Sequence, residues 1–196
     1  DIAKHIKFDP GMLDNAWIKN CVAVGLCGNF VEPLEATSIG TSIQQIFLLM
    51  HRLPNYTETT IKRYNDDIQG IMKNIRDFII LHYLTKKDNS KFWRDLQSLP
   101  IPDSLQEKLE KFKHNLPIEE DFRDTSKYSL FGANHYIHIL YGLDLLDINS
   151  INNEYKMFHY DVQDLAVQSL LETKTFDINT PMMTHKRFLE MIKSQR

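Results

Sequence analysis

The chain has 196 residues, of which 42% are hydrophobic and 25% are charged, and its formal net charge is −3. This composition is typical of a globular chain with a packed core, and the length suits one domain or part of a larger one. The 23 basic and 26 acidic residues are mixed along the sequence, so there is no electrostatic footprint for nucleic acid or an anionic membrane. The first residues do not form a signal peptide, and no apolar run approaches the roughly 20 residues that span a bilayer, so we expect a cytoplasmic protein.

The first 40 residues contain a short apolar run at residues 21–26, which predicts a buried strand. One strand cannot form a sheet, so we expect its partners to lie upstream. Cys21 and Cys27 have neither the spacing of a zinc site nor that of a disulfide framework, and we expect both to be reduced and buried. The chain begins at Asp1 and reaches a motif-rich segment early, so we expect it to be part of a longer protein.

The strongest helical pattern covers residues 57–84, where apolar side chains recur every three or four positions. An earlier helix is predicted after a loop at residues 28–38, with Thr37 or Ser38 as its N-cap. The apolar stripe of this earlier helix consists of Ile39, Ile43, Ile46, Phe47 and Met50.

The remaining sequence predicts short helices at residues 91–98, 103–115, 155–171 and 184–193. Asp103 and Thr184 are the expected N-caps of the second and the fourth of these helices. Residues 128–146 are rich in aromatic and aliphatic side chains, so they should be buried, but their mixed period decides neither helix nor strand. The predicted fold class is therefore mainly α, with a short N-terminal strand segment.

The most informative motif is Gly-Leu-Cys-Gly-Asn-Phe-Val-Glu-Pro-Leu-Glu-Ala-Thr-Ser-Ile, at residues 25–39. A loop that carries Glu32 and Glu35 leads here into the start of an amphipathic helix. The free N–H groups and the positive dipole end of a helix start suit a small anion such as a halide. A carboxylate in a largely apolar loop is a candidate base; alternatively, both glutamates are ordinary first-turn carboxylates that the helix dipole stabilises.

The chain resembles flavin-dependent tryptophan halogenases in several segments that follow the order of that family. Residues 17–26 (Trp-Ile-Lys-Asn-Cys-Val-Ala-Val-Gly-Leu) and 30–39 (Phe-Val-Glu-Pro-Leu-Glu-Ala-Thr-Ser-Ile) are similar to its Asn-Cys-Val-Ala and Glu-Pro-Leu-Glu-Ser-Thr segments. Further similar segments are residues 76–83, 92–94, 101–105 and 181–185. The resemblance covers nearly the whole chain, patchily between residues 116 and 180.

The resemblance implies a helical C-terminal substrate lobe of a larger α+β flavoprotein. Residues 1–40 would be the end of the flavin-binding core with the halide loop, and residues 41–196 the helical substrate-side domain. In this family reduced FAD and oxygen oxidise chloride or bromide to hypohalous acid, which passes through a tunnel to an indole. A separate flavin reductase supplies the reduced FAD. The complete protein is thus expected to be an enzyme that chlorinates or brominates tryptophan or another indole.

The resemblance also assigns roles to the motif at the helix start. Glu35 matches the glutamate that stabilises and deprotonates the cationic ring intermediate. Thr37, Ser38 and Ile39 match the residues next to the cofactor, and the backbone amides of Thr37 and Ser38 match those that hold the halide. Position 36 is commonly serine in the family but is Ala36 here, which removes a hydroxyl contact.

The substrate wall of the family comes from the aromatic segment after residue 127. Phe131 and Tyr136 are therefore candidates to line an indole pocket, and Asn134 to hydrogen-bond the substrate. Packing in the core is the alternative for each aromatic ring. His135 and His138 could share one helix face, but no carboxylate-bearing metalloprotease pattern accompanies them, so we predict no metal site.

The nucleotide-binding Gly-x-Gly-x-x-Gly loop, the catalytic lysine and the Trp-x-Trp-x-Ile-Pro motif of the family do not occur in these 196 residues. We therefore expect the isolated chain to be inactive and to bind no flavin. One alternative is a non-catalytic helical remnant with a binding or structural role, and another is a different flavin-dependent monooxygenase. The resemblance leaves open the halide, the ring carbon and the oligomeric state, a homodimer included.

Overall fold

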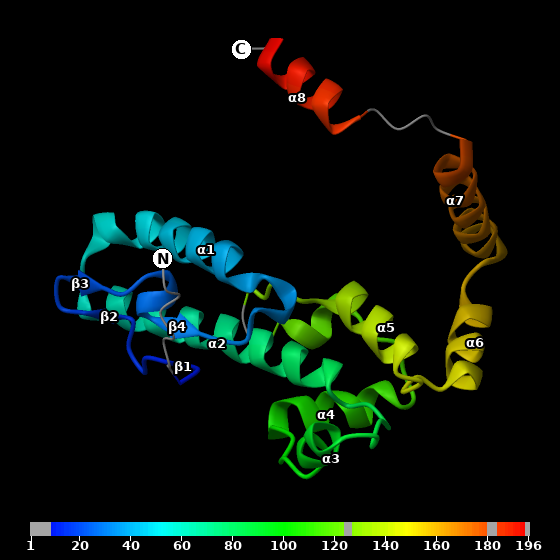
Figure 1. The fold of residues 1–196 in the computed structure, drawn as a ribbon, viewed down its shortest axis with the longest axis horizontal. Coiled ribbons are helices and arrows are strands. Elements are labelled where there is room, and N and C mark those ends of the chain that lie inside the picture. The colour runs from blue at the N-terminus through cyan, green and yellow to red at the C-terminus, as the bar shows by residue number, and fades with distance from the viewer. Residues whose placement is uncertain (1–8, 124–126, 180–183, 195–196) are drawn as a thin grey trace. The chain divides into compact units, whose positions relative to one another are not determined.

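The computed structural model describes residues 9–123, 127–179 and 184–194. The chain forms two compact units, the first ending at Ile151 and the second beginning at Asn152. Both are helical, with strands confined to the N-terminal part of the first (Figure 1), which confirms the mainly α fold class. Within the described ranges, no helix is both long enough and apolar enough to cross a bilayer.

The helices of the first unit are α1 (Thr37–Arg52), α2 (Glu58–His82), α3 (Lys91–Gln97), α4 (Asp103–Phe112) and α5 (Ala133–Gly142). α6 (Ile148–Met157) runs across the boundary, and the second unit continues with α7 (Tyr160–Asn179) and α8 (His185–Ser194). The strands are β1 (Gly11–Met12), β2 (Trp17–Ile18), β3 (Cys21–Val22) and β4 (Asn29–Phe30). Short 3₁₀ turns are η1 (Gly25–Cys27), η2 (Pro33–Glu35), η3 (Leu53–Asn55) and η4 (Glu119–Phe122).

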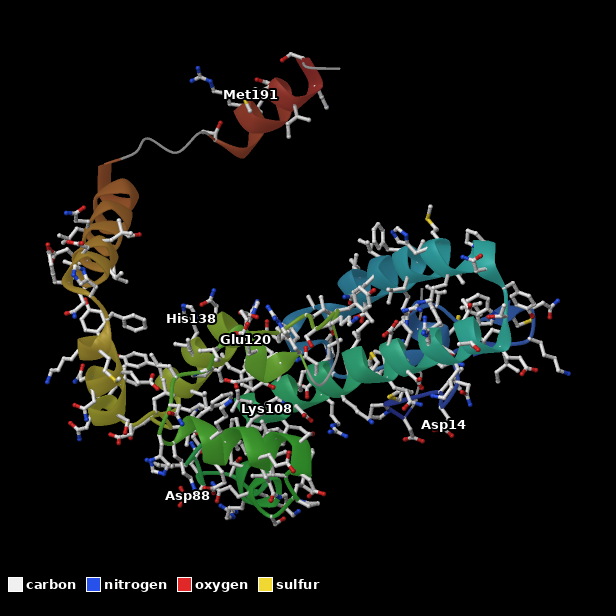
Figure 2. The ribbon with its side chains drawn as sticks, turned by 180° about the vertical axis from the view of Figure 1, so that it is seen from behind. Asp14, Asp88, Lys108, Glu120, His138 and Met191 are labelled. Carbon is white, nitrogen blue, oxygen red and sulfur yellow. The ribbon has the colours of Figure 1, made fainter. Side chains whose placement is uncertain are left out.

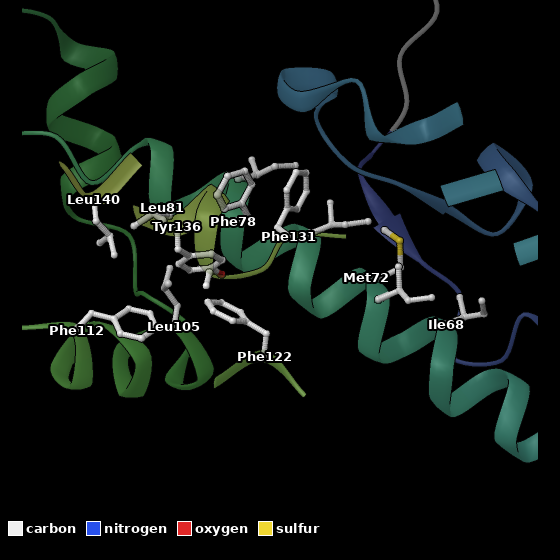
Figure 3. Close-up of a cluster of buried hydrophobic side chains, with 14 of the residues drawn as sticks. Ile68, Met72, Phe78, Leu81, Leu105, Phe112, Phe122, Phe131, Tyr136 and Leu140 are labelled. Atoms are coloured by element: carbon white, nitrogen blue, oxygen red, sulfur yellow. The ribbon is translucent and has the colours of Figure 1, made fainter. Parts of the chain in front are cut away.

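α2 is the central helix of the first unit, as its apolar period predicts. It begins after Thr57, whose hydroxyl accepts a hydrogen bond from the Thr60 N–H at 3.1 Å and so caps the helix. α1, β2, α4 and α5 all contact it. Its buried apolar side chains form a core with those of the neighbouring elements (Figure 3), and Phe78 stacks on Phe131 with ring centroids 4.0 Å apart. Burial of this apolar surface is the main stabilising contribution.

Two buried asparagines on α2 bind the backbone of segments that pass over it. Asn65 accepts the Trp17 N–H at 2.8 Å and donates to the Trp17 carbonyl at 2.9 Å. Asn74 accepts the Phe131 N–H at 3.0 Å and donates to the Phe131 carbonyl at 2.9 Å. The backbone N–H and carbonyl groups of Trp17 and Phe131 are at buried positions and need hydrogen-bond partners. The asparagine amides supply these partners, as a neighbouring strand would in a sheet. The two segments are thereby fixed on opposite halves of α2.

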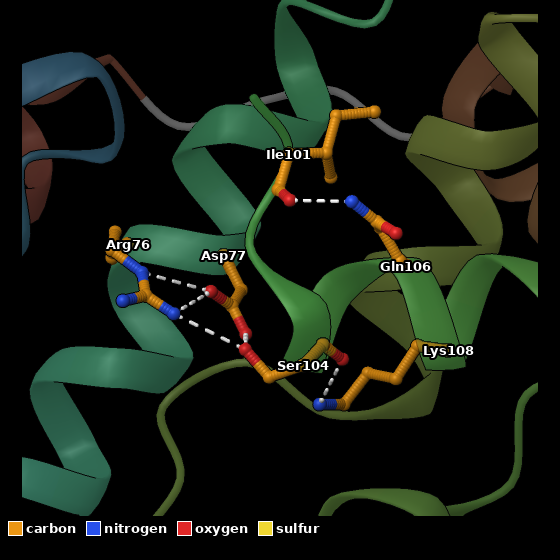
Figure 4. Close-up of polar contacts among 6 residues, drawn as sticks. All are labelled: Arg76, Asp77, Ile101, Ser104, Gln106 and Lys108. Carbon is orange, nitrogen blue, oxygen red and sulfur yellow. Dashed lines mark hydrogen bonds and ion pairs between the residues drawn. The ribbon is translucent and has the colours of Figure 1, made fainter. Parts of the chain in front are cut away.

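A buried carboxylate joins α2 to the start of α4 (Figure 4). Asp77 is fully buried, and Arg76 reaches it through Nη2 at 2.7 Å and Nε at 3.0 Å. The Ser104 hydroxyl, on the first turn of α4, donates to the other carboxylate oxygen at 2.6 Å. These charge-assisted hydrogen bonds offset the cost of removing the carboxylate from water.

The predicted apolar stripe of α1 does not face the core. Ile39, Ile43 and Met50 are 75%, 63% and 69% exposed, and Ile46 and Phe47 are exposed as well. The buried residues of α1 are Thr37, Thr41, Gln45 and Leu48. Two of these buried polar groups have partners: the Gln45 Oε1 accepts the Gly25 N–H at 2.6 Å, and the Thr41 hydroxyl donates to the Thr37 carbonyl of the same helix at 2.8 Å. The Gln45 Nε2 is buried without a hydrogen-bond partner in the part of the chain that the structure describes.

The N-terminal strands also differ from the prediction. β3 contains only Cys21 and Val22, and it pairs locally with β2 in an antiparallel register, while β1 pairs with β4. The apolar run turns away at Gly25, whose φ of 63° is left-handed and whose N–H binds Gln45. As a consequence Cys21 and Cys27 are free and exposed rather than buried.

The later helices mostly lie where the sequence predicts them. α3 follows the cap Ser90, and α4 begins at Asp103 but ends at Phe112, with Pro102 rather than Asp103 as its N-cap. α5 shows that the ambiguous segment becomes helical only after Gly132. The single helix expected at residues 155–171 is replaced by α6 and α7, which are separated at Phe158 and His159. The Thr184 hydroxyl accepts the Arg187 N–H at 3.4 Å, in agreement with its predicted role as the cap of α8.

Candidate active site at the start of α1

The candidate site is built around the turn η2, which connects β4 to α1. Ala36 is both the residue after η2 and the N-cap of α1, and its φ of 50° is left-handed. Its N–H donates to the Pro33 carbonyl at 3.0 Å, which closes the turn. The predicted caps, Thr37 and Ser38, lie inside the helix instead. This tight turn places Glu35 directly ahead of the first turn of α1.

Glu35 is held by a histidine at the end of α2. The His82 Nε2 lies 2.8 Å from the Glu35 Oε1, and the side chains are 17% and 35% exposed respectively. The His82 Nδ1 lies 2.8 Å from the Phe78 carbonyl one turn earlier in the helix. The sequence motifs alone did not identify His82 as a site residue. The available signal is its position four residues after Phe78, on the buried face of α2 and next to its C-terminus.

The other glutamate of the motif, Glu32, is bound by Tyr83, the residue after His82. The Tyr83 hydroxyl donates a short hydrogen bond to the Glu32 carboxylate. Burial, together with this contact to a negative charge, raises the pKa of Tyr83 to about 12. Both glutamates that flank Pro33 are therefore attached to the C-terminal end of α2, which fixes the η2 turn from both sides. This arrangement differs from that of freely solvated first-turn carboxylates.

Aromatic rings continue from this pair into the core. The His82 ring meets Phe78 edge-on, with centroids 4.8 Å apart, and Phe78 stacks on Phe131. Phe131 is 8% exposed and Tyr136 is fully buried (Figure 3), so both pack in the core. Asn134 is exposed on α5. The substrate-binding role of these three residues stays a prediction, and the core positions of the two rings favour the packing alternative for them.

Tyr136 has an unusual environment among these rings. Its hydroxyl has no hydrogen-bond partner in the part of the chain that the structure describes. Burial, and secondarily the nearby Asp77 charge, raises its pKa well above the ordinary range. The phenol therefore stays neutral, which is the form that suits a core position.

The start of α1 has free backbone N–H groups. No side chain caps it, and its first turn contains no acidic residue. Thr37 is buried, Ser38 is half-buried and Ile39 is exposed, so this turn is open on one side. Gly40, also in this first turn, faces open space. Among the described residues no group of three or more His, Cys, Asp or Glu side chains could hold a metal ion.

The described chain is mainly helical, and a carboxylate–imidazole pair lies directly ahead of the start of α1. The family model for tryptophan halogenase matches residues 1–152. The tryptophan 6-halogenase ThaL of Streptomyces albogriseolus is 30% identical over 179 residues, which are 85% of this chain and 33% of that protein. The tryptophan 6-halogenase SttH of Streptomyces toxytricini is 34% identical over 122 residues, or 61% of this chain and 23% of that protein. The chain therefore belongs to the tryptophan halogenase family.

Solved structures agree with this assignment. A tryptophan halogenase from Shewanella frigidimarina superposes with a TM-score of 0.75 at 29% identity, over 90% of this chain and 34% of that one. BrvH, a flavin-dependent halogenase from Brevundimonas sp., gives a TM-score of 0.73 at 29% identity, over 94% of this chain and 37% of that one. The chain thus spans about a third or less of the length of the curated relatives it matches.

Proposed function

We propose that this chain is the helical, substrate-side part of a flavin-dependent halogenase that chlorinates or brominates tryptophan or another indole. The observation that carries the proposal is the position of Glu35, immediately ahead of an uncapped helix start and fixed by His82. In this proposal residues 1–40 complete the flavin-binding core, and residues 41–196 form the substrate-side domain. A separate reductase supplies reduced flavin, and we place the complete enzyme in the cytoplasm with it.

The first turn of α1 would lie next to FAD and the halide. The backbone amides of Thr37 and Ser38 would hold chloride or bromide, because exposed N–H groups at a helix start favour an anion. Ile39, which is 75% exposed, would contact the flavin. Reduced FAD, when bound, supplies the oxidation of the halide by oxygen to hypohalous acid. The remaining steps concern residues of this chain.

Glu35 would act on the indole. When a ring carbon bonds to the halogen of hypohalous acid, the halogen–oxygen bond breaks and hydroxide leaves, to become water with the proton that the ring later loses. The ring is then cationic, and that carbon still carries its hydrogen. A nearby carboxylate stabilises this cation and then accepts the proton, which restores the aromatic ring. The Glu35 Oε1 is occupied by His82, so Oε2 would accept the proton. Ala36 has no hydroxyl, so the residue beside Glu35 makes no side-chain hydrogen bond to the oxidant.

The test uses the complete halogenase that contains this chain, with a flavin reductase, FAD, NADH, bromide or chloride, and tryptophan. Mass spectrometry should detect a monohalogenated product. Glu35→Gln should lower kcat at least roughly 100-fold with flavin binding unchanged, because the amide cannot accept the proton. The matched control is Glu58→Gln, an exposed first-turn carboxylate of α2, which should retain activity.

Each alternative gives its own result in this assay. A hydroxylated product, with no halogen incorporated from either halide, would indicate another flavin-dependent monooxygenase. If the complete protein neither binds flavin nor converts tryptophan or simple indoles, the result would indicate a binding or structural remnant. Full halogenation by Glu35→Gln would remove Glu35 from the mechanism.

A further inference from the structure

The His82–Glu35 contact places hydrogen-bond acceptors at both nitrogens of one imidazole ring. The Phe78 carbonyl, 2.8 Å from Nδ1, can only accept a hydrogen bond, so Nδ1 must carry a hydrogen. The carboxylate of Glu35, 2.8 Å from Nε2, is also an acceptor. A lone pair on Nε2 would therefore face a negative oxygen. The contact requires one hydrogen between Nε2 and Oε1.

We propose that His82 is the positioning residue of Glu35: its Nε2–H donates to Oε1, fixes the carboxylate plane, and leaves Oε2 directed to the substrate. The catalytic part of this role rests on the proposed function, whereas the hydrogen bond itself does not. The bridging hydrogen is bonded to Nε2, and the carboxylate oxygen accepts it. A charge-assisted hydrogen bond of this kind is stronger than a neutral one.

Neighbouring side chains hold the imidazole in this orientation. Phe78 packs edge-on against the ring from one turn earlier in α2, and it also contacts His135 of α5 at 6.1 Å between ring centroids. Tyr83 follows His82 in sequence and is bound to Glu32 of the loop before α1. The titratable groups that these contacts connect to the pair are Glu32, Tyr83 and His135. Glu32 accepts its hydrogen bond from the Tyr83 hydroxyl, and Glu35 lies against the His82 Nε2.

The chain contains an internal control for this arrangement. The His138 Nδ1 lies 2.6 Å from the carbonyl of Asn134, four residues earlier in α5. The His82 Nδ1 makes the same kind of contact with Phe78, four residues earlier in α2. His138 is exposed on α5 (Figure 2). Within the described ranges, no carboxylate forms an ion pair with it. The two histidines thus differ at Nε2, where only His82 has a carboxylate partner.

Nuclear magnetic resonance of the ¹⁵N-labelled 196-residue chain tests the hydrogen bond without any flavin or substrate. The His82 ring should show an Nε2–H that is protected from solvent exchange, whereas the exposed His138 should show no protected Nε2–H. Glu35→Gln should remove the Nε2–H signal of His82 and retain Nδ1–H, because the glutamine amide can donate to an unprotonated Nε2. The spectrum of His138 should not change.

The proposal is overturned if the wild-type chain shows no Nε2–H of His82, or if that hydrogen exchanges with solvent as fast as the ring hydrogens of the exposed His138. This comparison needs no variant, so it remains decisive even if Glu35→Gln does not fold. It is also overturned if a folded Glu35→Gln chain keeps the Nε2–H of His82. Both outcomes are independent of whether the complete protein is a halogenase.

A double-mutant cycle in the complete enzyme tests the positioning role. His82→Phe should lower kcat roughly 10- to 100-fold, with little change in KM for the indole, and His82→Gln should recover part of the loss through its amide N–H. The double variant with Glu35→Gln should be no slower than Glu35→Gln alone, because His82 acts through that carboxylate. If the fold-decrease in kcat of the double variant equals the product of the two single fold-decreases, His82 acts independently of Glu35, and the positioning role is overturned.

Discussion

Replacing Asn74 with alanine should be among the most destabilising single changes on α2. The side chain is 1% exposed, and its amide makes two hydrogen bonds to the Phe131 backbone, at 2.9 Å and 3.0 Å. Alanine removes both and leaves a buried N–H and a buried carbonyl without partners. Each orphaned group costs about 1–3 kcal/mol. We expect a loss of roughly 3 kcal/mol in the free energy of unfolding, a large fraction of the 5–15 kcal/mol that is typical of a domain.

Urea unfolding followed by circular dichroism at 222 nm measures this loss. With a slope of about 2–3 kcal/mol per molar urea, the midpoint should fall by roughly 1–1.5 M with little change in slope. The matched control is Asn134→Ala, an exposed asparagine on α5, which should change stability by less than about 0.5 kcal/mol. A loss below about 1 kcal/mol for Asn74→Ala would refute the conclusion that this amide holds the Phe131 segment on α2.

Three further predictions concern the first unit. On α1, Leu48→Ala should lower the free energy of unfolding by about 2–5 kcal/mol and Phe47→Ala by much less, because the Leu48 and Phe47 side chains are 3% and 59% exposed. Urea unfolding measures both losses, and equal losses would contradict the packing of α1. Burial raises the pKa of Tyr64 to about 12, so the folded state keeps a proton that the unfolded state loses near pH 10. Stability should therefore fall as pH rises from about 10 to about 12, and in Tyr64→Phe the melting temperature should fall less over this range. The same fall in both chains would contradict a contribution from Tyr64. Cys21 and Cys27 are both exposed, so a thiol reagent should react with two thiols in the native 196-residue chain. If the reagent reacted with both thiols only after denaturant was added, the exposure would be contradicted.

The candidate site was only partly accessible from the sequence. The motif identified Glu35, and the helix pattern placed it just before α1, because turn residues and apolar periods are local signals. His82 lies 47 positions later, and its role depends on how the end of α2 meets η2. Likewise, the aromatic composition made Phe131 and Tyr136 core candidates, and the resemblance to the halogenase family made them pocket candidates. Their burial against Phe78 and the neighbouring rings could be seen only in the folded chain.

The sequence by itself determined where most helices lie, since hydrophobic period and capping residues act within a few positions of each other. It also showed that the loop before α1 carries the candidate carboxylate, Glu35. Only the tertiary structure decided which face of α1 is buried. The period identifies an apolar side, but which side is buried depends on the segments that pack against the helix. Here the Gln45 Oε1 accepts the Gly25 N–H of the N-terminal segment, and Thr41 and Leu48 are buried on the same side. The same holds for the backbone of Trp17 and Phe131, whose hydrogen-bond partners are two asparagines far away in the sequence.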